Sequence, residues 1–323
     1  MTTEASTPPA STSALGGHDL WPALPYAEWA DTCQTLHRWS QIVGKTRLRL
    51  EPMLNHWWQV ALYVSARGLT TSAMPCSDGR LLEIEFDLHS HVLELRTSDG
   101  QREAMPLAPR SVADFYADYR GRLSALDVEA DIWPVPVELP DALPFADDQV
   151  HAAYDPAAAA RFHRVLVQAD RVLKVFRGRF LGKASPVHFF WGSFDLAVTR
   201  FSGRSAPPHP GGAPNVGDWV MREAYSHEVS SAGFWPGSPQ APDPAFYAYA
   251  YPTPEGFGDA PVRPEGAFFH RDLGEFFLPY EVMRTAPDPE RALLDFLEST
   301  YEAAADLAKW DRKGLERTET VGR

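Results

Sequence analysis

The chain has 323 residues, and 44% of them are apolar, which is enough to bury a large core as one domain or as two. Its formal net charge is −13 and it holds no dense run of Lys and Arg, which counts against nucleic acids and anionic membrane surfaces as partners. No apolar run approaches the ~20 residues of a membrane span. The two cysteines, Cys33 and Cys76, fit a reducing compartment better than a disulfide framework, so we expect a soluble, cytoplasmic protein.

The first part of the chain predicts a tail followed by an α+β segment. Residues 1–20 are rich in Ser, Thr, Ala and Pro and lack the features of a signal peptide, so we expect a disordered tail. Apolar residues at helical spacing predict a helix from Tyr26 that ends at Gly44-Lys45. Ser111 with Asp114 is typical of the start of a second helix. Strands are predicted over 48–50, 57–66, 81–88, 92–97 and 132–139, and a linker over 140–155.

The second part repeats this order. Asp155-Pro156 and Asp288-Pro289 each place a proline at the first position of a predicted helix, and the first of these helices ends at Gly182-Lys183. We expect the residues from 311 to 323 to fray. Strands are predicted over 187–201, 228–234, 246–251 and 266–278.

Both parts place an apolar segment of the same length between a tryptophan and an arginine, Trp58 to Arg67 and Trp191 to Arg200. We therefore predict an α+β protein of two structurally related halves, 21–139 and 156–310. Each half would be a mainly antiparallel sheet packed by long helices, with a pseudo-twofold duplication and a crevice between the halves as the default pocket. The alternative is that two amphipathic α+β segments look alike because they obey the same packing rules. Whether the two sheets join stays open.

Most of the candidate site residues lie in the second half. Strand periodicity places His188 and Arg200 on one face of the strand 187–201, and Trp191 and Asp195 on the other. Burying Asp195 without a partner would be costly, so it is either part of a structural ion pair or hydrogen-bond network, or a substrate-binding or catalytic carboxylate.

The segment Ser226-His227-Glu228 can supply acid/base chemistry near neutral pH, although adjacent strand residues point to opposite faces. The alternative is an ordinary polar pair at a strand edge. Further candidates for binding a substrate are His209 in a Pro/Gly loop, Tyr249 in an alternating Tyr strand, and Trp235. The alternatives are that the loop is a surface turn and that the aromatic residues pack in the core.

A cofactor is not indicated by any motif. The chain lacks a phosphate-binding loop, a dinucleotide fingerprint, a Ser-hydrolase elbow and a CxxC pair. His209, His227, Glu228 and His270 can form a metal site only if separate loops bring them together, because their spacing matches no metal motif.

The chain carries several specific strings: Leu24-Pro25-Tyr26 with Trp29, Gln41-Ile42-Val43-Gly44-Lys45, Asn55-His56-Trp57-Trp58, Pro186-Val187-His188-Phe189-Phe190-Trp191-Gly192-Ser193-Phe194-Asp195, and Tyr225-Ser226-His227-Glu228. On these strings it resembles a bacterial family known as domain of unknown function 5996, over nearly the whole chain after the tail. The resemblance implies no established activity, so no catalytic residue is carried over.

Two hypotheses for the function follow. The first is an enzyme that acts on a small polar molecule, with His227 as acid/base, Asp195 or Glu228 as a second carboxylate and Arg200 as an anion anchor. The second is a non-catalytic protein that binds a small molecule in an aromatic-lined crevice between the halves. The enzyme hypothesis requires His188, Asp195, Arg200, His227 and Glu228 to converge in an open cleft.

Overall fold

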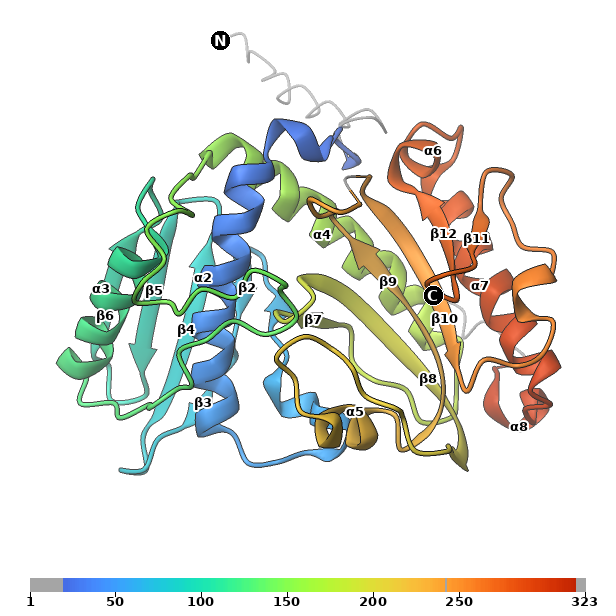
Figure 1. Ribbon diagram of the computed structural model, residues 1–323, viewed down its shortest axis with the longest axis horizontal. Helices are drawn as coiled ribbons and strands as arrows, with labels where there is room; N and C mark the ends of the chain where they lie inside the picture. The colour runs from blue at the N-terminus through green and yellow to red at the C-terminus, as the bar shows by residue number, and fades with distance from the viewer. Residues whose placement is uncertain (1–19, 242, 318–323) are drawn as a thin grey trace, which may run out of the picture.

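The computed structural model describes residues 20–241 and 243–317. The predicted tail lies outside this range except for Leu20. Two six-stranded antiparallel sheets and long helices make up the fold, which confirms the predicted α+β class with two sheet-containing halves (Figure 1). No helix in the described part of the chain is long and apolar enough to cross a membrane.

Most neighbouring strands in each sheet follow one another in the chain. The first sheet has the order β1-β2-β4-β5-β6, with β3 beside β4. Its strands are β1 (Tyr63–Val64), β2 (Gly68–Thr70), β3 (Met74–Pro75), β4 (Leu81–Asp87), β5 (Val92–Thr97) and β6 (Arg102–Pro106). The second sheet has the order β11-β12-β10-β9-β8-β7. Its strands are β7 (His188–Phe190), β8 (Asp195–Ser205), β9 (His227–Trp235), β10 (Ala245–Tyr251), β11 (Phe268–His270) and β12 (Glu275–Pro279).

The two sheets meet where β1 approaches β7. The backbone N–H of Leu62 donates to the carbonyl of Phe189 at 2.9 Å, and the N–H of Phe189 donates to the carbonyl of Leu62 at 2.8 Å. Outward from this junction, β1-β2-β4-β5-β6 matches β7-β8-β9-β10-β12 strand for strand. This correspondence of strand order is what the predicted pseudo-twofold duplication requires.

The register of the repeat differs from the one that the sequence indicates. The hairpins β1-β2 and β7-β8 have turns of equal length. When the two hairpins are aligned on these turns, Val64 corresponds to Phe190 and Leu69 corresponds to Asp195. Arg67 consequently lies at the end of a turn while Arg200 lies within β8, so the matching intervals from Trp58 and Trp191 are not equivalent in space.

Four long helices pack on the sheets: α2 (Ala30–Leu50), α3 (Val112–Ala125), α4 (Pro156–Gly178) and α7 (Pro289–Leu307). The starts of α3, α4 and α7 agree with the sequence, whereas α2 begins at Ala30 and not at the predicted Tyr26. Ser111 accepts the N–H of Asp114 at 3.0 Å, while Asp155 and Asp288 cap α4 and α7. Shorter elements are η1 (Tyr26–Glu28), η2 (Asn55–Val60), η3 (Phe257–Asp259), α5 (Asp218–Ala224), α6 (Tyr280–Arg284) and α8 (Arg312–Leu315).

Two predicted boundaries near the junction are wrong. Helix α2 runs through Gly44 to Leu50, because this glycine serves close packing and not termination: a Cβ at Gly44 would overlap the indole of Trp191. The predicted strand 57–66 begins instead as the turn η2, in which His56 and Trp57 adopt a left-handed backbone with φ of 60°.

The second sheet is covered on both faces. Helices α4 and α7 pack on one face, where the Arg200 guanidinium stacks 3.4 Å from the ring centroid of Phe176. The end of α2, η2, α5 and residues 131–138 cover the other face. Figure 1 shows α2 on the near side of the molecule and α4 behind β8 to β10.

The segment 131–155 holds neither the predicted strand nor any helix, yet it is packed. The 140–155 linker is anchored by a buried ion pair between Arg38 Nε and Asp148 at 3.3 Å.

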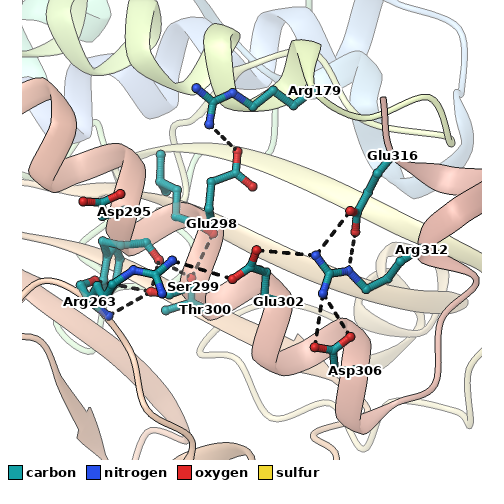
Figure 2. Close-up of polar contacts among 12 residues, drawn as sticks. Arg179, Arg263, Asp295, Glu298, Ser299, Thr300, Glu302, Asp306, Arg312 and Glu316 are labelled. Carbon is teal, nitrogen blue, oxygen red and sulfur yellow. Dashed lines mark hydrogen bonds and ion pairs between the residues drawn. The ribbon is translucent and has the colours of Figure 1, made fainter. Parts of the chain in front are cut away.

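The chain end does not fray where it is described. Arg312 of α8 pairs with Asp306, Glu302 and Glu316, and Figure 2 shows this cluster on α7. Glu316 also forms a β-bridge with Phe180. The described part of the predicted frayed segment, residues 311–317, is therefore tied to α4 and α7.

Candidate functional site

A cavity of about 700 Å³ lies between the halves, on the face of the second sheet that α2 and α5 cover. Its most conspicuous feature is five tryptophans contributed by four separate segments: Trp57, Trp58, Trp133, Trp191 and Trp219. Trp133 and Trp219 are more than half exposed, whereas Trp191 is buried and donates its indole N–H to the Val60 carbonyl at 2.8 Å.

The floor of the cavity follows from strand alternation. Asp195, Ala197, Thr199 and Phe201 point from β8 into the cavity, as the period of two predicts for Asp195 and its neighbours. The cross-strand partners continue this surface, with Ser231 opposite Thr199 on β9 and Tyr249 opposite Ser231 on β10.

One end of the floor is acidic. Asp195 is buried and accepts hydrogen bonds from the Ser193 and Tyr247 hydroxyls. Burial raises the pKa of Asp195, and the two hydrogen bonds partly offset the shift. Enclosure by the protein and the nearby Asp195 charge raise the pKa of Glu138 to about 7, and the same two causes raise that of Glu275 to about 7.

Close packing places these groups. The carboxylate of Glu138 lies against Gly192, where a Cβ would overlap it. Glu138 is exposed to the cavity itself although protein surrounds it, and no described residue donates a hydrogen bond to its carboxylate. A ligand that excludes solvent from the cavity would desolvate the Glu138 carboxylate further and so raise its pKa.

Lys45 also forms part of the cavity wall. Only 4% of the residue is exposed, and its Nζ lies 4.8 Å from the ring centroid of Trp133 and 5.7 Å from that of Trp191. Burial lowers the pKa of Lys45 to about 8, with no carboxylate among the described residues to offset it.

A second basic group lies near η2. The Lys183 Nζ donates to His56 Nε2 at 2.7 Å, and His56 Nδ1 donates to the Ala224 carbonyl at 3.1 Å. Burial and the Lys183 charge lower the pKa of His56, so the ring is held neutral and in one tautomer.

Three of the residues singled out from the sequence line the cavity, namely Asp195, Trp191 and Tyr249. The predicted acid/base pair is not beside them. Glu228 pairs with Arg204 and Ser202 away from the cavity, while His227 lies next to Ser226 and edge-on to His56.

The other four are placed elsewhere. Arg200 is stacked between Phe176 and Tyr301 on the α4 and α7 side. His188 pairs with Ala197 and so lies on the opposite face from Arg200, because the turn 191–194 interrupts the predicted continuous strand. His188 is buried beneath Trp58, His209 stacks on Tyr225 at 4.7 Å, and Trp235 lies outside the cavity lining.

No group of three or more His, Cys, Asp or Glu residues within 20–241 and 243–317 is placed to hold a metal ion. The residues proposed for such a site, His209, His227, Glu228 and His270, are thus not assembled into one.

Sequence reasoning missed Lys45, Glu138 and four of the five tryptophans of the cavity, all except Trp191. The string Gly44-Lys45 predicts a helix end and so gives no sign of a buried lysine. The pattern of residues 132–139 predicts a strand and gives no sign that Trp133 and Glu138 form cavity wall.

A family model described as a family of unknown function, DUF5996, matches residues 21–317. The chain belongs to this family. The match covers both sheets and every element of the cavity wall, so the cavity is a feature within the DUF5996 region. Neither a curated protein nor a solved structure matches the chain.

Proposed function

We propose that this protein binds a small, flat and mainly apolar molecule without transforming it. The observation that carries the proposal is the wall of five tryptophans around a cavity of about 700 Å³. Indole faces bind flat rings by stacking and by burial of apolar area, and pockets of this size accommodate molecules of drug-like dimensions.

The acidic end of the cavity supports a more specific proposal for the polar part of the ligand. Glu138 has an unused carboxylate, and Asp195 has two hydrogen bonds but further acceptor capacity. A hydrogen-bond donor on the ligand, such as an amine or a ring N–H, would supply the hydrogen bonds that the Glu138 and Asp195 carboxyl groups still lack.

The enzyme hypothesis receives less support. It requires five residues to converge in a cleft. Glu228 pairs with Arg204 and Arg200 stacks on Phe176, both on the far face, while His188 is buried. Of the five, only Asp195 lines the cavity. A general base must reach the proton it removes, and His227 does not line the cavity.

A cytoplasmic location remains part of the proposal. Cys33 and Cys76 are both free, which fits a reducing compartment.

A thermal-shift screen of flat aromatic amines and heteroaromatic compounds tests the proposal, since a ligand of the native state raises its stability. We expect hits on the wild type that weaken at least tenfold in Trp133→Ala, whose side chain is 54% exposed and so contributes little to the core. Trp235→Ala, outside the cavity, is the matched control. Absence of hits, or equal loss in both variants, would contradict the proposal.

A further inference from the structure

We propose that Lys45 is a nucleophilic amine that binds ligands carrying an aldehyde or ketone as an imine. This inference rests on the proposed function in one respect, because it assigns a chemical class to ligands of the same cavity.

The first support is the position of the amine. Only 4% of Lys45 is exposed, and Lys45 is one of the residues that line the cavity, so a ligand in the cavity lies beside it. It extends from α2 at the residue after Gly44, where the Trp191 indole occupies the space that a Gly44 side chain would take. The helix and the indole together fix the direction of the lysine stem.

The second support is the absence of a counter-ion. The Nζ has the indole faces of Trp133 and Trp191 as neighbours, at 4.8 and 5.7 Å from the ring centroids, and no carboxylate among the described residues. Lys174 has the opposite arrangement, since its Nζ pairs with Asp170. A desolvated amine without an acidic partner is the arrangement that activates a lysine nucleophile.

The third support is the fraction of neutral amine. With a pKa of about 8, about a tenth of Lys45 is neutral at pH 7, against about 0.03% for an ordinary lysine. The available nucleophile is thus about 300-fold more abundant, although each amine is somewhat less reactive as its pKa falls.

The chemistry requires no further reactant. The neutral amine attacks the carbonyl carbon and forms a C–N bond, and the carbonyl oxygen takes up a proton to give a carbinolamine. Loss of that oxygen as water leaves the imine. One amine and one carbonyl compound give one imine and one water, with no change of oxidation state. The aromatic walls then hold the rest of the ligand.

The test uses the intact wild-type protein, benzaldehyde as probe and cyanoborohydride to reduce the imine to a stable secondary amine. The chain has only five lysines, Lys45, Lys174, Lys183, Lys309 and Lys313, so peptide mass spectrometry gives the rate at each. We expect Lys45 to be alkylated at least tenfold faster than Lys174 and Lys313 at pH 7. We also expect its rate to rise with pH to a midpoint near 8.

Labelling of Lys45 no faster than that of Lys174 and Lys313, or preferential labelling of Lys183, would overturn the assignment. Lys45→Met removes the amine at similar length and should lose the fast adduct. Lys45→Arg keeps the charge and should lose it as well. Circular dichroism of both variants verifies the fold, and the wild-type site map decides the question if either variant fails to fold.

Benzyl alcohol, which matches the probe in shape but forms no imine, separates this inference from the proposed function. Stabilisation by the alcohol without a fast Lys45 adduct contradicts the imine and leaves the binding function standing. A fast Lys45 adduct without stabilisation by any flat aromatic compound supports the reactive amine and contradicts the binding function.

Discussion

At the scale of single residues, Gly44 and Trp191 determine the shape of the cavity wall. A Cβ at Gly44 would overlap the indole, and Trp191 is held in place by its hydrogen bond to the Val60 carbonyl. We expect Gly44→Ala to destabilise the fold by about 1–3 kcal/mol through overpacking, despite the better helix propensity of alanine.

Gly121 provides the matched control, since it lies exposed in α3 with nothing within 4 Å of a Cβ. Gly121→Ala should stabilise by up to about 1 kcal/mol. Urea unfolding measures both variants, and an equal gain in the two would mean that Gly44 has no packing role.

His188 gives a pH-dependent prediction. Burial and the charges of Arg47 and Arg177 lower the pKa of His188 to about 3, and neither ring nitrogen has a hydrogen-bond partner among the described residues. The folded state therefore binds fewer protons than the unfolded state below about pH 6.5, so this group makes stability fall as pH falls from there.

We expect His188→Phe, which keeps a ring beside Trp58 and Tyr63, to gain about 2 kcal/mol over the wild type at pH 5 from this linkage alone. That contribution should vanish at pH 8. Unfolding curves at the two pH values measure it, and a variant advantage that is the same at both would show that His188 is not held neutral.

Some of these residues are visible in the sequence and others are not. The helix starts are marked in the sequence by Ser111, Asp155 and Asp288, because each capping side chain accepts a backbone N–H only two or three residues later. The role of Gly44 depends on Trp191, nearly 150 residues away, and a packing glycine in a helix has no local signature. The same holds for Lys45, whose buried setting is made by Trp133 and Trp191.

At the scale of elements, the segment 131–138 closes the cavity although it is neither helix nor strand. Gln41 of α2 holds it: the side-chain amide donates to the Val137 carbonyl and accepts the Val137 N–H, both at 2.8 Å. Gln41 is fully buried, so these bonds are not replaced by water in the folded state.

We expect Gln41→Leu to release this segment, with a stability loss of about 1–3 kcal/mol from the two unpaired backbone groups. A glutamate-specific protease should cut after Glu138 at least tenfold faster than in the wild type. Gln34→Leu, on the same helix and only partly buried, is the control. Unchanged cleavage in Gln41→Leu would show that the clamp does not hold the wall.

The local sequence pattern predicts which segments form strands and helices better than it predicts what those segments pack against. Strand β5 spans the predicted 92–97, and β4 ends one residue before the predicted 88, because alternating apolar residues define a half-buried strand. The apolar segment 57–66 fails because its tryptophans line a cavity and its first residues turn with positive φ. Aromatic side chains around a cavity thus produce the apolar pattern of a strand.

At the scale of the whole molecule, the two halves depend on each other. They share the backbone junction at Leu62 and Phe189, and α2 of the first half covers the cavity face of the second sheet. Phe162 of α4 packs in return beside Leu36, Leu69 and Phe86 of the first half. The sequence predicts two similar halves, but it does not reveal this exchange of helices.

The whole chain should therefore unfold in one cooperative transition, and segments 21–139 and 156–310 expressed alone should lack fixed tertiary structure. Near-ultraviolet circular dichroism and urea unfolding of the whole chain and of each segment test this prediction. A half that folds alone with a cooperative transition would contradict the interdependence of the halves.

The cavity as a ligand site is tested most directly by fluorine NMR of protein labelled with 5-fluorotryptophan, titrated with the compound that stabilises it most in the thermal-shift screen. The chain has 10 tryptophans, and five line the cavity. The account predicts shifts for Trp57, Trp58, Trp133, Trp191 and Trp219, with Trp21, Trp29, Trp39, Trp235 and Trp310 unchanged. Shifts confined to the second group, or spread evenly over both, would contradict it.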